Sequence, residues 1–206
     1  ACAKAGLDIH LVLGRGKPAD GPDLVQGNLL LDHLVGAHVE IIDGQVGPEV
    51  DARIAEVADE YRQAGRNVYE WDRYTVKSLA AVSYVLCLVE IIEQAREDGQ
   101  LETRAGGWTP QAVYGCSAGS TGAGMVLAAA ALGAQYPVRH VAPIVWPWDT
   151  RADMAKIATE AGERIGVEAS FVDDDIELFE EFVGPDYGVV TPGCLEAMAV
   201  LARTEG

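Results

Sequence analysis

Basic residues are scarce in this chain of 206 residues. It has 15 lysines and arginines against 32 aspartates and glutamates, which gives a formal charge of −17 at pH 7. Nucleic acids and anionic membrane surfaces attract positively charged proteins, so this charge argues against both as partners. The chain also lacks an apolar run near the roughly 20 residues that cross a bilayer, and no signal peptide is recognisable. We therefore expect neither nucleic-acid nor membrane partners.

Aromatic residues and cysteines are also few. Aromatics make up 7% of the chain, and its four cysteines are widely spaced, at Cys2, Cys87, Cys116 and Cys194. No C-x-x-C pair occurs, and no histidine stands at a metal-ligand spacing from a cysteine. Since each cysteine lies in an apolar stretch, we expect buried free thiols, no metal site and a reducing, cytoplasmic environment.

Short apolar runs alternate with amphipathic segments along the chain. Helical spacing occurs at 24–34, 49–63, 76–96, 125–132, 150–165 and 193–203. Strand patterns occur at 8–13, 37–42, 67–71, 112–116, 138–145 and 169–172. Strands that alternate with helices are typical of parallel sheets with helices on both faces. The sequence therefore predicts an α/β protein, with the polar loop 98–109 as the crossover between two domains.

The most informative segment is a glycine-rich turn between a predicted strand and a predicted helix. Ala112–Cys116 is the strand, Ser117–Gly124 is the turn, and Met125–Leu132 belongs to the helix. Small residues allow a tight turn, and the first N–H groups of a helix have no partner within it. Together with the hydroxyls of Ser120 and Thr121, these groups favour an anion, best of all a phosphate.

The same turn has other interpretations. Gly115–Gly119 fits the G-x-S-x-G pattern of an α/β-hydrolase-type serine esterase, with Ser117 as the nucleophile. The only later histidine is His140, and no acid lies between it and Ser117, so the usual triad order cannot be completed. The glycines at 119, 122 and 124 do not have dinucleotide-site spacing, and the P-loop pattern is absent. A turn that only packs a helix on a sheet is a further alternative.

Four stretches share their order and spacing with one enzyme family. They are AKAGL (3–7) with HLVL (10–13), GNLLL (27–31) with LVGA (34–37), GSTGAGM (119–125), and GPDYG (184–188) with LEA (195–197) and ARTEG (202–206). On these residues the chain resembles the pyridoxal-phosphate enzymes of the tryptophan-synthase-β fold (fold type II). Within them it is most similar to the group of aminocyclopropane-carboxylate deaminase, D-cysteine desulfhydrase and cysteate sulfo-lyase.

The resemblance implies a fold, a cofactor and a set of site residues. It implies a two-domain fold, with 1–98 as most of the smaller domain and 99–206 as part of the larger, cofactor-phosphate-binding domain. The resemblance further implies pyridoxal 5'-phosphate as the cofactor and a homodimer as the assembly. Tyr187 is placed where the deaminases carry an active-site tyrosine, so its phenol would exchange a proton during chemistry at Cα. The cup for the cofactor phosphate would be Ala118, Gly119, Ser120, Thr121 and Gly122.

Parts of the family pattern are not found in this chain. The Schiff-base lysine and the loop that binds the substrate carboxylate lie, in the family, before the first residue, and the segment beside the pyridine nitrogen lies after the last. The chain therefore looks like an internal fragment, incomplete at both ends, and the fragment alone is expected to be inactive.

One departure from the family concerns the substrate. Where the group has a glycine- and serine-rich loop before its long helix, this chain has Trp71–Ser78, and we expect Tyr74, Thr75 and Lys77 to face the substrate. The positive charges of Arg73 and Lys77 predict a substrate other than the cyclopropane amino acid, with an extra anionic group. The predicted function is a lyase or deaminase acting on a small amino acid, by β-elimination or deamination to a keto acid and ammonia. A serine hydrolase and a non-catalytic remnant of the lyase fold are the alternatives.

Overall fold

The computed structural model describes the chain except for residues 16–24, 44–46, 73–74, 98–109, 186–187 and 206. It divides into two compact units, unit 1 (Ala1–Trp71) and unit 2 (Asp72–Gly206). This division lies before the predicted domain boundary at residue 98, because the long helix that follows Trp71 packs against later helices of unit 2. The assignment of 1–98 and 99–206 as functional domains stays a prediction.

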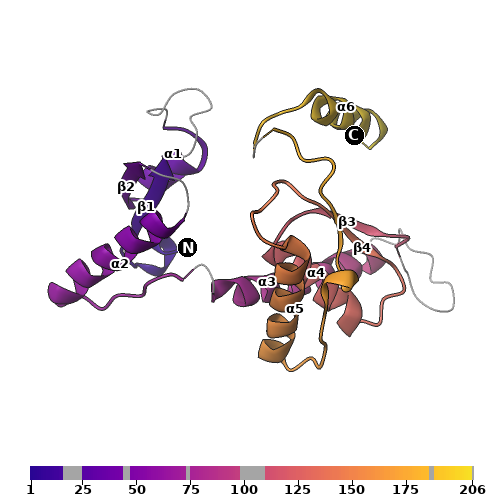
Figure 1. The fold of residues 1–206 in the computed structure, drawn as a ribbon, viewed down its shortest axis with the longest axis horizontal. Coiled ribbons are helices and arrows are strands. Elements are labelled where there is room, and N and C mark those ends of the chain that lie inside the picture. Colours follow the sequence, from indigo (N-terminus) through magenta and orange to yellow (C-terminus); the bar gives the residue numbers. More distant parts are fainter. Residues whose placement is uncertain (16–24, 44–46, 73–74, 98–109, 186–187, 206) are drawn as a thin grey trace. The chain divides into compact units, whose positions relative to one another are not determined.

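Unit 1 is a small parallel α/β unit. A short 3-10 turn (η1, Ala3–Ala5) precedes β1 (His10–Arg15), α1 (Gly27–Leu34), β2 (His38–Asp43) and α2 (Pro48–Gln63), as Figure 1 shows. Strands β1 and β2 pair in parallel with His10 opposite His38. A parallel pair needs a crossover, and α1 lies on the connection between them. Helix α2 packs against β1 through its apolar face, where Val50 and Val57 are buried.

The strand predicted at 67–71 does not form. This segment is irregular, and neither β1 nor β2 pairs with it. It is tied to α2 instead, because Glu70 accepts a 2.9 Å hydrogen bond from Arg62, while the Tyr69 side chain is 84% exposed. The alternation of apolar and polar residues in this stretch was therefore not a sign of sheet pairing.

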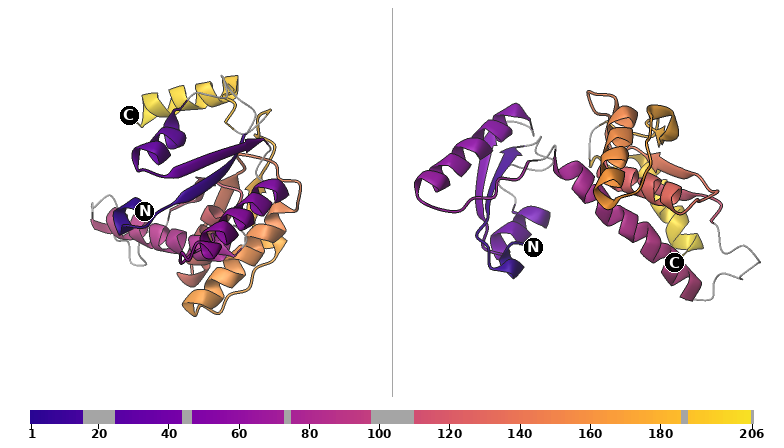
Figure 2. Two further views of the ribbon diagram at one scale, coloured as in Figure 1. Left: turned by 90° about the vertical axis from the view of Figure 1, so that its left-hand side faces the viewer. Right: turned by 90° about the horizontal axis from the view of Figure 1, so that it is seen from below.

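Unit 2 holds a three-stranded parallel sheet and its helices. In chain order its elements are α3 (Val76–Glu97), β3 (Val113–Cys116), α4 (Ser120–Ala131), β4 (Val138–Val141), α5 (Thr150–Ile165), the 3-10 turn η2 (Asp173–Asp175), β5 (Glu177–Phe179) and α6 (Pro192–Thr204). The strand order is β3-β4-β5. Helix α4 packs against α3, α5 and β4, and Figure 2 shows α3 running beside it. The predicted α/β class with parallel sheets is confirmed.

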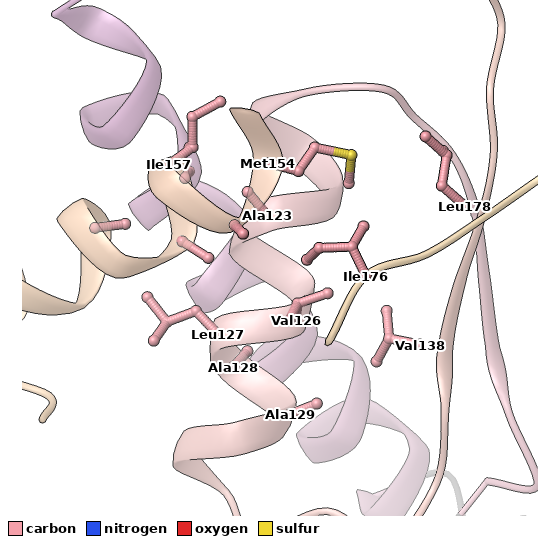
Figure 3. Packing of buried hydrophobic residues seen from close by; sticks show 14 of the residues in the cluster. Ala123, Val126, Leu127, Ala128, Ala129, Val138, Met154, Ile157, Ile176 and Leu178 are labelled. Atoms are coloured by element: carbon pink, nitrogen blue, oxygen red, sulfur yellow. The ribbon is translucent and has the colours of Figure 1, made fainter. Parts of the chain in front are cut away.

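The core of unit 2 surrounds α4. Ala123, Leu127 and Ala128 are fully buried, because α4 is apolar on all sides and lies between other elements. In Figure 3, Val126 and Ala129 lie on the side of Val138 and Ile176, whereas Leu127 lies on the opposite side of the helix. The small residues of α4 allow this close approach from several directions. The core thus fixes the start of α4, where the glycine-rich turn leads in.

The other face of this sheet carries polar side chains. Tyr114, Arg139 and Glu177 stand opposite one another on the three strands. The guanidinium of Arg139 donates to the Tyr114 hydroxyl and to the Glu177 carboxylate, both at 2.7 Å. The alternating residues Val113, Val138 and Leu178 point toward the helices instead.

Two other sequence predictions differ from the structure. No strand forms at 169–172; the third strand of the sheet is β5, where Leu178 is 3% exposed. The amide of Phe171 donates to the Thr159 side chain of α5, which takes that segment away from the sheet.

The cysteines are free but not buried, because Cys116 points to the open sheet face and Cys194 lies on the exposed helix α6. Within the described ranges, no helix is long and apolar enough to cross a membrane.

Candidate phosphate-binding site

The candidate site is the turn Ser117–Gly119, at the carboxyl end of β3, where parallel sheets commonly bind ligands. The turn is held to its neighbours by two hydrogen bonds of Ser117. Its amide donates to the carbonyl of Val141 at the end of β4, at 3.0 Å. Its hydroxyl oxygen accepts from the amide of Gly122 at 2.9 Å, and the side chain is only 6% exposed. Ser117 therefore fixes the turn against the first turn of α4.

The amides at the start of α4 remain available. Among the described residues, none accepts a hydrogen bond from the N–H of Ala118, Gly119, Ser120 or Thr121, and the hydroxyls of Ser120 and Thr121 also have no partner there. All four residues are partly exposed. These N–H groups lie at the positive end of a helix of 12 residues. They form a set of donors that suits an anion with several acceptor oxygens.

The glycines of the turn and of α4 have different surroundings. A Cβ placed on Gly119 would meet no atom of the described residues within 4 Å, so the space in front of this residue is open on their side. A Cβ on Gly122 would lie 2.5 Å from Cε of Met154 and 3.0 Å from the ring of His140. A Cβ on Gly124 would overlap the backbone carbonyl of Ala81 in α3. Gly122 and Gly124 therefore serve packing, whereas Gly119 leaves room for a ligand.

His140 lies directly beneath the start of α4. It belongs to β4, pairs with Gly115 of β3, and is fully buried. Neither ring nitrogen has a hydrogen-bond partner within the described part of the chain. Burial lowers the pKa of His140 to about 4, because the charged imidazolium loses its hydration there. His140 is therefore neutral at physiological pH, and its ring supports the turn by packing.

A pair of stacked tryptophans contacts the turn from the β4–α5 connection. The indole Nε1–H of Trp146 donates to the carbonyl of Ala118 at 3.2 Å. The rings of Trp146 and Trp148 stack with their centroids 4.7 Å apart and their planes 9° from parallel. Lys77, near the start of α3, places its ammonium 5.5 Å from the Trp148 ring centroid and pairs with Asp153 at 2.9 Å. These contacts connect the turn to α3 and α5.

The structure brings some of the predicted site residues together at the turn and leaves others apart from it. Of the five residues of the predicted cup, 118–121 have free amides beside one another, whereas Gly122 is buried and its amide is bonded to Ser117. Lys77 is connected to that site through the tryptophans, but Asp153 already neutralises its charge. Thr75 is exposed at the start of α3, and its hydroxyl points to the Asp72 carbonyl at 3.5 Å. Arg73, Tyr74 and Tyr187 lie outside the described residues.

The serine-hydrolase interpretation finds no support in this geometry. A nucleophilic serine needs an accessible hydroxyl paired with a base. The Ser117 hydroxyl is buried and accepts from the Gly122 amide. His140 bonds to no partner in the described structure, so it does not activate Ser117.

Two residues of this site were not predicted from the sequence. His140 carried a weak signal, because its alternation with Val138 in an apolar strand places both on one face. Trp146 carried none, since its contact with Ala118 joins residues 28 positions apart. Both contacts arise only when β4 lies beside β3.

The fold and the site together define a parallel α/β protein in which a turn with free backbone amides follows a sheet strand. The family model described as pyridoxal-phosphate dependent enzyme matches residues 1–206, so the chain belongs to that family. The resemblance noted from the sequence is thereby confirmed, and pyridoxal phosphate is the cofactor of this family.

Two of the relatives are named as deaminases. A 1-aminocyclopropane-1-carboxylate deaminase of Burkholderia cenocepacia is 30% identical over 182 residues, which cover 87% of this chain and 52% of the relative. A 1-aminocyclopropane-1-carboxylate deaminase of Methylobacterium nodulans is 27% identical over 208 residues, which cover 99% of this chain and 59% of the relative. A crystal structure of an ACC deaminase homologue aligns with a TM-score of 0.72 at 23% identity, over 100% of this chain and 57% of the other, and supports the fold. The chain spans about half the length of these curated relatives.

Proposed function

We propose that the whole protein is a pyridoxal-phosphate-dependent lyase or deaminase that converts a small amino acid to a keto acid and ammonia. The family supports the cofactor, and the relatives named as 1-aminocyclopropane-1-carboxylate deaminases support the reaction class. The observation that carries the proposal is the row of free amides at Ala118–Thr121 beside the open space at Gly119.

The turn suits the cofactor phosphate in both charge and shape. A phosphate monoester carries nearly two negative charges and three acceptor oxygens at neutral pH. The amides of Gly119, Ser120 and Thr121 supply three donors, and the hydroxyls of Ser120 and Thr121 supply two more. Hydrogen bonds to charged groups contribute about 1.5–3 kcal/mol each. In this proposal Ser117 holds the turn closed, because it occupies the Gly122 amide and leaves the earlier amides for the ligand.

The remaining roles follow from the family resemblance. When bound, pyridoxal phosphate withdraws electrons from the α-carbon of an amino acid. This chain's turn would anchor the phosphate end, so that the rest of the cofactor has one fixed orientation. Tyr187 would then hold or accept a proton near the α-carbon. Tyr74 and Thr75 stay proposed substrate contacts, and the homodimer stays a prediction that sedimentation equilibrium tests.

The role of Lys77 toward the substrate now has an argument against it. Its ammonium is paired with Asp153 through both carboxylate oxygens, at 2.9 and 3.2 Å. A second anion at this ammonium would have to compete with that carboxylate. We therefore propose that the substrate is a small amino acid with an uncharged side chain, in preference to one with an acidic side chain. The rates of the whole protein on aminocyclopropane carboxylate and on acidic amino acids test this choice.

Gly119→Ala tests the phosphate site. The added methyl group meets no atom of the part of the chain that the structure describes, so we expect the fold to be kept, but it occupies the space in front of the free amides. We expect pyridoxal phosphate and inorganic phosphate to bind the whole protein at least about tenfold more weakly, by the loss of one charge-assisted hydrogen bond. Gly193→Ala is the matched control, because this glycine lies at the start of another helix, α6, and among the described residues its Cβ would meet one atom, Oγ1 of Thr191, at 3.9 Å. Equal affinities of both variants would contradict the proposal.

Two chemical probes separate the lyase from its alternatives. The whole protein should show a visible absorption band with the cofactor, and borohydride should abolish this band and modify one lysine. A fluorophosphonate that labels Ser117 would favour the hydrolase instead. A non-catalytic remnant of the fold would show neither the absorption band of the cofactor nor the label on Ser117.

A further inference from the structure

The carbonyl of Ala118 and the amide of Gly119 belong to one peptide unit. A trans peptide is planar, so its C=O and its N–H point in opposite directions. A donor that fixes the carbonyl on one side of the turn thereby fixes the amide on the other side. In this structure the donor is the Trp146 indole, which bonds the Ala118 carbonyl at 3.2 Å.

The opposite orientation of this peptide would prevent anion binding. Rotation of the peptide plane would turn the Ala118 carbonyl oxygen toward the space in front of Gly119. A carbonyl oxygen there repels a phosphate, whereas the N–H attracts it. Gly119 has no side chain that would restrict such a rotation, and no atom of the described residues lies within 4 Å of the position its Cβ would take. The turn therefore needs a contact that selects one orientation.

We propose that Trp146 is a positioning residue that holds the Ala118–Gly119 peptide with its N–H toward the bound phosphate. Trp146 does not touch the phosphate; it acts through the Ala118 carbonyl. This inference rests on the proposed phosphate site and adds a residue outside the glycine-rich motif to it.

The indole of Trp146 is itself held in place. Its ring stacks on Trp148 with an interplanar angle of 9°. The Lys77 ammonium lies 5.5 Å from the Trp148 ring centroid and forms an ion pair with Asp153. Such stacks and cation–π contacts restrict the rotation of exposed aromatic rings. Trp146 is 36% exposed, so without the stack its side chain would be free to leave the turn.

Two phenylalanine variants separate the hydrogen bond from the stack. Trp146→Phe removes the indole N–H and keeps an aromatic ring against Trp148. Trp148→Phe makes the same exchange in the same stack but leaves the bond to Ala118. We expect Trp146→Phe to weaken the binding of pyridoxal phosphate and of inorganic phosphate to the whole protein about 3- to 10-fold, the range for one hydrogen bond. Trp148→Phe should change either affinity less than about twofold, since it keeps the hydrogen bond to Ala118 and leaves an aromatic ring stacked on Trp146.

Two further measurements exclude a general loss of structure. The 31P chemical shift of the bound cofactor should move in Trp146→Phe and match the parent in Trp148→Phe. Replacing Trp146 by its benzothiophene isostere, in which sulfur takes the place of Nε1–H, should reproduce the weaker binding with unchanged shape.

Equal losses in the two phenylalanine variants, or unchanged affinity in Trp146→Phe or in the isostere, would overturn the inference. If Gly119→Ala weakens binding and Trp146→Phe does not, only the role of Trp146 fails. If the parent protein binds no phosphate at all, the proposed function fails and this inference fails with it.

Discussion

The buried histidine beneath the turn makes the stability of unit 2 dependent on pH. Burial lowers the pKa of His140 to about 4, whereas an unfolded histidine titrates near 6.5. The unfolded chain therefore binds this proton first as the pH falls. Above about pH 7 the titration of His140 does not affect the free energy of unfolding. The free energy of unfolding decreases as the pH falls below about 6.5, and below about pH 4 the stabilisation from keeping His140 neutral is lost completely.

The size of this effect follows from the two pKa values. Full protonation in the unfolded state but not in the folded state costs about 1.4 kcal/mol per unit of pKa difference. Between pH 7.5 and pH 4.5 the contribution of His140 amounts to about 2.5 kcal/mol. This is a large fraction of the 5–15 kcal/mol that stabilises a typical domain.

Urea unfolding of the parent and of His140→Leu at both pH values measures this contribution. Leucine keeps an apolar side chain of similar size and cannot titrate. The variant is needed because burial, with His38 as the second cause, also lowers the pKa of His10 in unit 1. We expect His140→Leu to lose about 2.5 kcal/mol less than the parent between the two pH values. Parallel losses in the two proteins would refute the account of His140 as a buried neutral base.

Two other substitutions test the packing of the turn. Gly124→Ala should lower the free energy of unfolding by about 1–3 kcal/mol or more in a urea titration, because its methyl group meets the backbone carbonyl of Ala81 and neither helix can yield; an unchanged midpoint would show that α3 and α4 are not so close. Ser117→Ala should cost about 1–3 kcal/mol, because it leaves the buried Gly122 amide without an acceptor. A Ser117→Ala protein as stable as the parent would contradict the structural role given to this hydroxyl.

Local patterns were sufficient to predict most elements of the fold. The helix expected at 150–165 has these bounds in the structure, because Asp149 caps it at one end and Gly166 ends it at the other. The strand predicted at 112–116 forms at 113–116, but the helix predicted to begin at Met125 begins at Ser120, so residues 120–124 of the predicted turn are helical. Such signals depend only on neighbouring residues, and so they can be read without the rest of the fold.

The errors concern short strands. β5 has three residues, too few for an alternating pattern, and its place in the sheet depends on pairing with β4. Phe171 looked like a strand residue, but its amide bonds to Thr159 of α5. No local pattern distinguishes these two outcomes, because both depend on contacts between distant segments.

The candidate site shows the same limit. The anion-binding turn was predictable, because glycines, small hydroxyl residues and a helix start are adjacent in the sequence. The roles of its glycines were not, since Gly122 and Gly124 are distinguished from Gly119 only by Met154, His140 and Ala81. Ser117 looked like a nucleophile in the sequence but is an acceptor for a backbone amide in the structure.

The central claim is that the backbone amides at the start of α4 bind the phosphate of the cofactor. Amide 1H–15N spectra of the whole protein, recorded with and without pyridoxal phosphate, test this claim most directly. We predict that the amide protons of Gly119, Ser120 and Thr121 shift strongly downfield on binding, while the Gly122 amide, already bonded to Ser117, shifts much less. A bound cofactor that leaves the Gly119, Ser120 and Thr121 resonances in place would contradict the claim.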